Sequence, residues 1–267
     1  RYTMTADARE LTVMFCDMRG FTRLSETMAP TELQALLNKV FSRLTHVIRR
    51  HRGTIDKYMG DCVMAFWGAP LPAPDHAALA VQAALDMAAE VDAINREHAQ
   101  QGLPAIGVGI GLNTGDMCVG DMGSDVRRSY TVIGDAVNLA SRLEGLTAQY
   151  GAPIVASDAT RKQCPAFLWQ ELDTVRVKGK AQAVSIHTPL CLASDASPEL
   201  RNELALWKQA LQAWRAQQWD DCDVLLLNLT CQNAEKVLYR RMAERVAFMR
   251  RSPPGYSWDG ATTFETK

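Results

Sequence analysis

The strings D-M-R-G-F-T at residues 17–22 and I-D-K-Y-M-G-D at residues 55–61 carry most of the structural information in this chain. Each places one aspartate, Asp17 or Asp61, beside a glycine turn and next to an apolar run. An isolated aspartate in such a place is most often a turn or cap residue. Two in matching contexts favour a different interpretation, because separated carboxylates are the hard oxygen ligands that divalent metal ions require beside phosphates.

A third string, T-V-I-G-D-A-V-N-L-A-S-R at residues 131–142, adds an amide and a cation. Asn138 and Arg142 are four positions apart, so they share one face of the helix expected there. As isolated helix residues they would most often be solvated surface, but the string V-N-L-A-S-R is specific. Together the three strings resemble the class III nucleotidyl cyclases, the family that converts ATP or GTP into a 3′,5′-cyclic nucleotide and pyrophosphate.

The composition is that of a folded domain without a nucleic-acid partner. The 267 residues are 47% hydrophobic, enough to bury a full core in one or two domains. Lys plus Arg (29) nearly cancels Asp plus Glu (30), and the formal net charge of -1 gives no field that would attract nucleic acid. Seven cysteines without a C-x-x-C pair favour a reducing compartment over a disulfide or zinc framework.

We expect the chain to be a cytoplasmic piece of a larger protein. Its longest dense apolar stretch, Val224–Leu229, is far shorter than a membrane span. Arg1 opens the sequence without Met or a signal-like region. In the bacterial enzymes that the chain resembles, membrane-anchored sensors often precede the catalytic domain. The resemblance therefore implies an upstream sensor module in a membrane-anchored full-length protein.

Strand and helix patterns alternate through the first two thirds of the chain. Apolar residues at helical spacing predict helices over 31–50, 75–99 and 137–146. Short β-branched and apolar runs predict strands over 11–16, 54–58, 62–67, 106–112, 117–119, 130–133, 154–156, 175–177 and 184–188. This order predicts an α+β sheet with helices on one face. It agrees with the ferredoxin-like core, rich in antiparallel strands, that the resemblance implies.

A second unit is expected after the catalytic domain, which we place at residues 1–192. Residues 193–252 are rich in Trp, Leu and Ala, and their spacing predicts a helical hairpin like a single tetratricopeptide repeat. One such hairpin cannot bury its own apolar face, so it should pack on the core or across a dimer. Gly, Pro and Thr are frequent over residues 253–267, which predicts a disordered tail.

The glycine-rich run G-V-G-I-G at residues 107–111 looks like part of a phosphate-binding loop. It lies inside an alternating apolar run, however, and lacks the full G-x-G-x-x-G spacing. We therefore expect a strand whose glycines allow another element to pack closely on it.

The resemblance assigns metal and phosphate roles for a cyclisation in which the ribose 3′-hydroxyl attacks the α-phosphorus and pyrophosphate departs. Asp17 and Asp61 would hold two Mg²⁺ or Mn²⁺ ions per site, and Met18 lies with them in the metal motif. Ions held in this way activate the attacking oxygen and clamp the leaving group. The turn through Gly20 and Phe21 matches the segment whose backbone amides meet the phosphates.

The resemblance also assigns the base. Lys57 and Thr131 would read the adenine edge, so the substrate should be ATP; guanylyl cyclases carry Glu and typically Cys at these two positions. Most adenylyl cyclases of the class have Asp where this chain has Thr131. The branch with Thr includes bicarbonate-responsive enzymes, so bicarbonate sensitivity is a hypothesis. As an isolated residue, Thr131 would be an ordinary β-branched strand residue.

For the transition state, the resemblance implies that Asn138 orients the ribose and that Arg142 meets the charge building on the α-phosphate. Lys180, in the string V-K-G-K, matches the lysine of the triphosphate and is preferred over Lys178. Arg128 or the arginine before it would be a further phosphate cation. Basic residues in loops are often plain surface charges.

Strand alternation gives two further expectations. Cys16 and Cys62 adjoin the aspartates, so they should face away from the site as small buried residues. A turn at Met59–Gly60 would pair Lys57 with Cys62 and put Lys57 and Asp61 on opposite faces. That arrangement favours a site shared between two protomers. The resemblance likewise implies a homodimer with two equivalent sites.

Two other functions remain open. A cyclase-like domain without catalysis, which only binds nucleotide or a partner, would lack one of the acids or the Asn-Arg pair, and this chain has them all. A diguanylate cyclase would carry a G-G-[DE]-E-F string, and none is present. We therefore expect an adenylyl cyclase catalytic domain with a helical C-terminal appendage.

Overall fold

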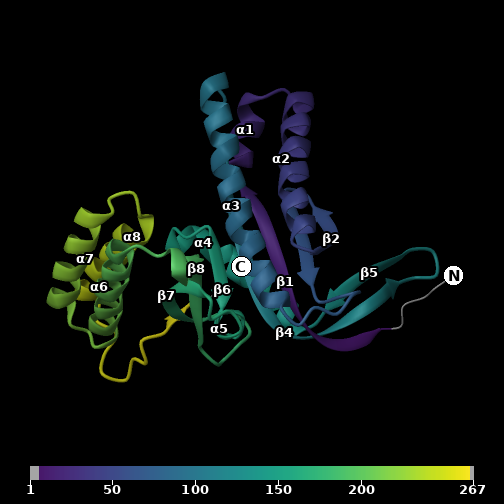
Figure 1. Ribbon diagram of the computed structural model, residues 1–267. Helices are drawn as coiled ribbons and strands as arrows, with labels where there is room; N and C mark the ends of the chain where they lie inside the picture. Colours follow the sequence, from purple (N-terminus) through teal and green to yellow (C-terminus); the bar gives the residue numbers. More distant parts are fainter. Residues whose placement is uncertain (1–5, 265–267) are drawn as a thin grey trace.

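The computed structural model describes residues 6–264, which form an α+β fold around one open sheet (Figure 1). The strands are β1 (Asp7–Arg19), β2 (Thr54–Met59), β3 (Cys62–Trp67), β4 (Gly107–Gly123), β5 (Arg128–Ile133), β6 (Ile154–Ser157), β7 (Phe167–Arg176), β8 (Val184–Leu192) and β9 (Thr262–Thr263). The helices are α1 (Phe21–Thr27), α2 (Pro30–Arg50), α3 (His76–Gln101), α4 (Asp135–Tyr150), α5 (Asp158–Lys162), α6 (Pro198–Arg215), α7 (Trp219–Gln232) and α8 (Val237–Arg251). The strand order is β2-β3-β1-β4-β6-β8-β7-β9, with β5 paired to β4. The predicted α+β class is confirmed.

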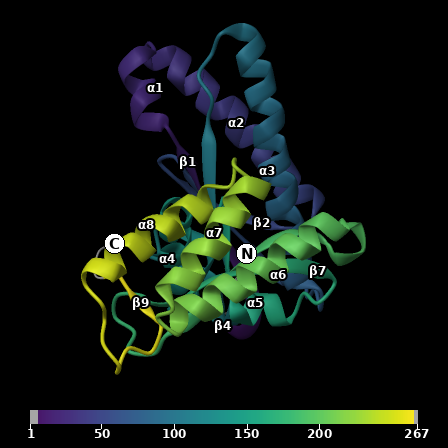
Figure 2. The ribbon, with the colours of Figure 1, turned by 90° about the vertical axis from the view of Figure 1, so that its left-hand side faces the viewer.

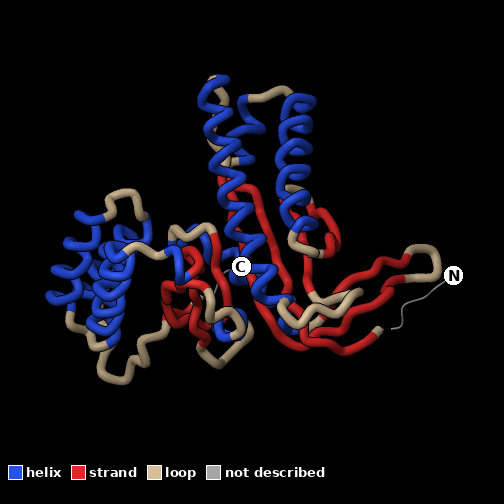
Figure 3. The backbone as a smooth tube through the Cα atoms, viewed as in Figure 1, coloured by secondary structure: helices blue, strands red, loops and turns tan. Residues whose placement is uncertain are grey.

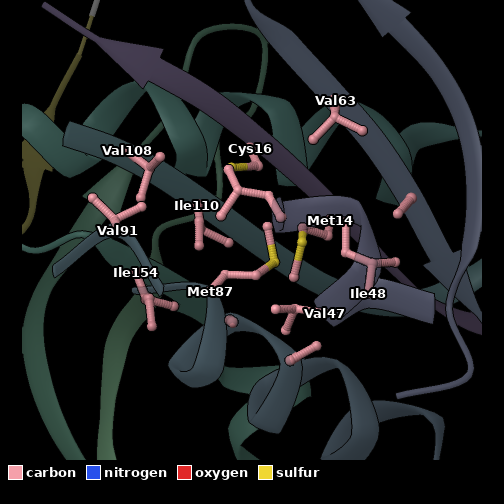
Figure 4. Close-up of a cluster of buried hydrophobic side chains, with 14 of the residues drawn as sticks. Met14, Cys16, Val47, Ile48, Val63, Met87, Val91, Val108, Ile110 and Ile154 are labelled. Carbon is pink, nitrogen blue, oxygen red and sulfur yellow. The ribbon is translucent and has the colours of Figure 1, made fainter. Parts of the chain in front are cut away.

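Strand β1 is buried on both faces and separates two cores. Met14 and Cys16 pack with α2 and α3 (Figure 4), whereas Val13 and Phe15 pack with α4 and β5. Helices therefore cover both faces of the sheet, and the prediction of helices on one face is wrong. The physical reason is the unbroken apolar run over residues 13–16, which is typical of a strand buried on both sides.

Strand β4 continues without interruption through its 17 residues, so the predicted break between strands over 106–112 and 117–119 is wrong. These polar residues stay in the strand because the fold satisfies their hydrogen bonds. Asn113 Nδ2 donates to the carbonyl of Ala136 at 2.8 Å. The hydroxyls of Thr114 and Thr12 share a hydrogen bond of 2.8 Å across the β1–β4 ladder.

The β2–β3 hairpin turns at Gly60–Asp61, one residue later than predicted. Met59 pairs with Cys62, and Lys57 pairs with Met64. The predicted pairing of Lys57 with Cys62 is therefore wrong. Gly60 has a φ of 62°, the left-handed conformation that glycine allows in a tight hairpin turn, and this fixes where the chain reverses.

The hairpin of β4 and β5 projects from the body of the molecule as a long arm (Figures 1 and 3). At its tip Val126 is 96% exposed. Further along β5, the ring of Tyr130 lies 6.0 Å from the ring of Phe66 on β3. This part of β5 therefore covers the sheet face that β1 presents with Val13 and Phe15.

Three helices, α6, α7 and α8, form the C-terminal unit beside the sheet (Figure 2), so the predicted hairpin is one helix short. Trp207 and Trp214 of α6 and Tyr239 of α8 are at most 2% exposed. They share one apolar cluster with Leu143 of α4 and Val175 of β7. The third helix and the sheet together bury the apolar faces that a hairpin alone would leave open.

The predicted disordered tail is wrong for residues 253–264. The ring of Trp258 lies 5.5 Å from the ring of Trp214, and the short strand β9 pairs in parallel with β7. Thr262 of β9 donates a hydrogen bond of 2.8 Å to Asp173. Aromatic packing and strand pairing thus outweigh the Gly and Pro content. Residues 265–267 of that prediction lie outside the described residues.

Candidate functional site

The two aspartates of the quoted strings lie together where β1 ends beside the β2–β3 turn. The N–H of Met18 donates to the carbonyl of Asp61 at 3.0 Å. Asp17 is half-buried, and its Oδ1 is buried without a hydrogen-bond partner. Burial, and after it the charge of Asp61, raises the pKa of Asp17 to about 6. A cation between the carboxylates would relieve both effects, so these residues fit a divalent metal ion.

Within the described part of the chain, the ligand set is limited to these two carboxylates. Across residues 6–264, no group of three or more His, Cys, Asp or Glu side chains could hold a metal ion. Oxygens from a phosphate and from water would have to complete the coordination shell, as is usual for Mg²⁺. The side chain of Met18 is in the α2–α3 core, so only its backbone faces this place. Gly20, with a φ of 82°, forms the turn that leads to Phe21 at the start of α1.

The two cysteines beside the aspartates differ in facing. Cys16 packs in the core between β1 and helices α2 and α3, as predicted (Figure 4). Cys62 lies opposite Asp17 in the β1–β3 ladder, so their side chains share a face, and the prediction for Cys62 is wrong. Asp61 lies in the turn, where strand alternation no longer applies. Burial raises the pKa of Cys62 to about 12, which keeps the thiol neutral.

Two charged groups that sequence reasoning missed, Glu144 of α4 and Arg19 of β1, lie beside Asp17. Gly109 is opposite Asp17 in the β1–β4 ladder. A Cβ at Gly109 would lie 2.9 Å from Glu144 Oε1 and 2.7 Å from Arg19 Nη2. Burial, followed by the charge of Asp17, raises the pKa of Glu144 to about 7. Arg19 shares the face of Asp17 by strand alternation, which the sequence could have revealed.

Helix α4 rests directly on β4. A Cβ at Gly111 would lie 2.3 Å from the carbonyl oxygen of Ala140, so the glycine run of β4 serves close packing, as predicted. Each helix residue rotates about 100° from the one before it, so Glu144 and Arg142 project about 200° apart. Glu144 faces the sheet, and Arg142 therefore projects away from it.

Asn138 and Arg142 line a cavity of about 600 Å³ on the outer face of α4. The cavity is enclosed by α4, the β7–β8 loop and Phe264. Arg142 Nη2 lies 3.6 Å from the position of a Cβ on Gly179 in that loop, and Lys178 lines the same cavity. The structure thus brings the predicted amide and guanidinium together, but on the side of α4 away from Asp17.

Lys57 and Thr131 meet at a third residue, Asp56, which sequence reasoning missed. The hydroxyl of Thr131 donates to Asp56 Oδ2 at 2.5 Å, and Lys57 Nζ lies 3.6 Å from Asp56 Oδ1. The Asp56 side chain is fully buried, while that of Lys57 is 47% exposed. Lys57 pairs with Met64, so it lies on the face of the sheet that carries Asp17. The pairing of Lys57 with Cys62, on which the predicted opposite facing of Lys57 and Asp61 rested, is therefore wrong.

The remaining predicted cations lie in different places. Lys180 Nζ lies 2.6 Å from Asp135 Oδ2 at the start of α4, and this contact lowers the pKa of Asp135. Arg128 is the first residue of β5 and lies 3.4 Å from Asp125 in the β4–β5 turn. The arm that β4 and β5 form projects away from α4 (Figure 1). Lys178 lines the cavity of Asn138, whereas Lys180 is not among the lining residues and forms an ion pair with Asp135.

Comparison with known proteins gives a consistent result. Residues 4–188 match the family described as the adenylate and guanylate cyclase catalytic domain. Adenylate cyclase 1 of Rhizobium meliloti is 38% identical over 67% of this chain, and the adenylate cyclase of Anabaena cylindrica is 42% identical over 68%. The crystal structure of the adenylyl cyclase CyaB from P. aeruginosa is 34% identical, with a TM-score of 0.66 over 72% of this chain and all of that one.

The chain spans 27% and 37% of the length of those two relatives. The match ends before α6, so the C-terminal helices lie outside the matched region. Within residues 6–264, no helix has the length and apolar character needed to cross a membrane.

Proposed function

Because this chain belongs to the family of adenylate and guanylate cyclase catalytic domains, we propose that it converts ATP into 3′,5′-cyclic AMP and pyrophosphate. The observation that carries this proposal is the pair of Asp17 and Asp61 at the end of β1. Their closeness, with the unpartnered Oδ1 of Asp17, is unfavourable until a cation joins them. Such a pair suits a metal-assisted reaction at a phosphate.

Asp17 and Asp61 would hold two Mg²⁺ or Mn²⁺ ions, with the backbone of Met18 beside them. When bound, these ions would supply charge neutralisation at the attacking and leaving oxygens. The protein itself would hold the two carboxylates at a fixed separation. The hydrogen bond from the Met18 N–H to the Asp61 carbonyl does this, because it ties the β2–β3 turn to the end of β1.

We propose that Asn138 and Arg142 act on the ribose and the α-phosphate. Arg142 carries a permanent charge and, with Lys178, makes the cavity on α4 positive. A guanidinium fixed where negative charge develops lowers the barrier more than one that must reorganise. Lys180 would neutralise the outer phosphates after leaving Asp135.

The active site is proposed to be shared between two copies of the chain. The reason differs from the one predicted from the sequence, since Lys57 and Asp17 share a face. Helix α4 lies on the sheet, with Glu144 toward Asp17 and Arg142 on the far side. One chain therefore cannot bring Asp17 and Arg142 to the same phosphate. In a twofold dimer, α4 of the partner can present its outer face to Asp17.

The base is proposed to be adenine, with Lys57 and Thr131 at its edge. The family description includes both adenylate and guanylate cyclases, so the family match leaves the base open. Two features support adenine: the exposed ammonium of Lys57 and a Thr131 hydroxyl whose hydrogen points to Asp56. An upstream sensor, a membrane anchor and bicarbonate stimulation remain predictions from the sequence resemblance.

The direct test is to incubate the purified chain with ATP or GTP and with Mg²⁺ or Mn²⁺, and to identify the product by chromatography. Cyclic AMP from ATP is expected, with Asp61→Asn as the inactive control and Asp92→Asn, an exposed acid of α3, as the active one. No cyclic product from either nucleotide, together with retained nucleotide binding, would replace this proposal with a catalytically silent domain.

A further inference from the structure

Asp56 occupies an unusual place in strand β2. The β2–β3 ladder shifts register between Ile55, which pairs with Ala65, and Lys57, which pairs with Met64. Asp56 is the extra residue of this β-bulge, and a bulge re-aims the side chain that it carries. The Asp56 side chain is 0% exposed, although carboxylates are rarely buried without a partner. The bulge therefore directs a buried acid toward β5.

The hydrogen bond between Thr131 and Asp56 has a fixed donor and a fixed acceptor. A carboxylate only accepts, so the 2.5 Å contact between Thr131 Oγ1 and Asp56 Oδ2 must use the hydroxyl hydrogen of Thr131. Thr131 is 8% exposed, so water does not compete for that hydrogen. With its one hydrogen committed, Thr131 Oγ1 can only accept a further hydrogen bond.

We infer that Asp56 sets the base preference of the site by making Thr131 an obligatory acceptor. This inference rests on the proposed function, in which Thr131 lies at the edge of the purine. Adenine presents an amino group at C6, which donates to an acceptor; guanine presents a carbonyl there, which repels one. A site built around a fixed acceptor rejects guanine, because the hydroxyl oxygen of Thr131 and the carbonyl oxygen of guanine would face each other with no hydrogen between them. Asp56 is thus a specificity-determining residue that acts through Thr131.

The test is Asp56→Asn, which keeps the shape of the side chain. Lys57 Nζ lies 3.6 Å from Oδ1, so the amide should turn its oxygen toward Lys57 and its NH₂ toward Thr131. The amide would then donate to Thr131 Oγ1 and free the hydroxyl hydrogen for a guanine carbonyl. The ratio of kcat/KM for ATP to kcat/KM for GTP should fall by about tenfold or more. Both rates come from one preparation, so a lower folded fraction cancels.

Two controls separate this role from a structural one. In the Thr131→Val background, Asp56→Asn should leave the ratio unchanged, because the hydroxyl through which it acts is gone. Asp92→Asn removes the same charge from the exposed face of α3 and should also leave the ratio unchanged. If Asp56→Asn lowered kcat/KM equally for ATP and for GTP, Asp56 would only stabilise the strand, and the inference would be overturned. If Asp56→Asn still changed the ratio of kcat/KM for ATP to kcat/KM for GTP in the Thr131→Val background, Asp56 would act through Lys57, and the inference would be overturned.

If Asp56→Asn is too slow to measure, binding replaces turnover. The dissociation constants of 3′-deoxy-ATP and 3′-deoxy-GTP, which lack the attacking hydroxyl, give the same ratio, and a fall of about tenfold is again expected. An unchanged ratio of constants would overturn the inference. If the wild-type chain forms cyclic AMP and Asp56→Asn has the same ratio of ATP to GTP as the wild type, only the role of Asp56 is refuted. If the wild-type chain has no cyclase activity, the proposed function is refuted.

Discussion

Helix α4 separates Asp17 from Arg142. Asp17 lies under the helix, opposite Gly109, where Glu144 approaches it from the sheet-facing side of α4. Arg142 projects from the other side of the same helix into the cavity beside Gly179. Under the proposed function, Asp17 and Arg142 of one chain would therefore serve different phosphates. The proposed function accordingly needs two copies of the chain, with the cyclase site at their interface.

The first prediction concerns the carboxylate pair. Asp17→Asn and Asp61→Asn should each reduce cyclic AMP formation by roughly 10³-fold or more, because several kcal/mol of charge stabilisation in the transition state depend on the bound ions. Thermal unfolding of both variants should stay close to that of the wild type, since neither carboxylate satisfies a core hydrogen bond. Activity within twofold of wild type at saturating Mn²⁺ would show that the pair is not the metal site.

The second prediction concerns pH. Burial, followed by the nearby Arg161, lowers the pKa of His187 from 6.5 to about 4. The unfolded chain binds the proton more readily, so the stability that neutral His187 provides is present above pH 6.5 and is lost as the pH falls toward 4. The loss is of the order of 3 kcal/mol. As the pH falls from 7 to 4, the free energy of unfolding of His187→Gln should therefore decrease less than that of the wild type.

Chemical denaturation across that range measures the difference. His46→Gln, which changes an exposed histidine of α2, is the matched control and should follow the wild type at every pH. A stability difference between His187→Gln and the wild type that does not change with pH would contradict the assignment.

The third prediction concerns the C-terminal helices. Asp173 of β7 is fully buried, and its Oδ2 accepts hydrogen bonds from Tyr150, Thr262 and Arg245 at 2.6, 2.8 and 2.9 Å. Arg245→Met would leave this buried charge without its cation, which costs about 3–5 kcal/mol. Arg241→Met, at an exposed position of the same helix, should cost less than about 0.5 kcal/mol. Urea unfolding of both variants checks this, and equal losses would mean that the helices do not depend on the Asp173 contact.

The sequence was most informative where function rests on short strings. Asp17, Asn138 and Arg142 lie in segments whose strand or helix period is plain, so their elements could be predicted. The register of β2 could not, because it depends on the left-handed Gly60 and on a bulge that leaves no periodic signal. The wrong pairing of Lys57 with Cys62 follows from that register, and the error for Cys62 follows from the place of Asp61 in the turn.

Groups joined only by packing could not be found from the sequence. Asp56 meets Thr131 across 75 positions, and Glu144 reaches Asp17 only because α4 packs against glycines of β4. The tail was predicted to be disordered from its Gly and Pro content, but Trp258 finds an aromatic partner in α6 that no local pattern could indicate. The predicted break in β4 between residues 112 and 117 was wrong for the same reason, since Asn113 and Thr114 form hydrogen bonds with partners distant in the sequence.

The shared site is tested most directly by complementation between Asp17→Ala and Asn138→Ala. Asp17→Ala should be inactive alone, and Asn138→Ala should lose roughly 10²–10³-fold through a missing transition-state contact. In a mixed dimer, one site carries both changes and the other carries neither. With random exchange, half of the dimers are mixed and each has one intact site, so activity should recover to about a quarter of wild type. Mixed dimers that form but stay at the level of the single variants would mean that each chain holds a complete site, which contradicts the separation of Asp17 and Arg142 by helix α4.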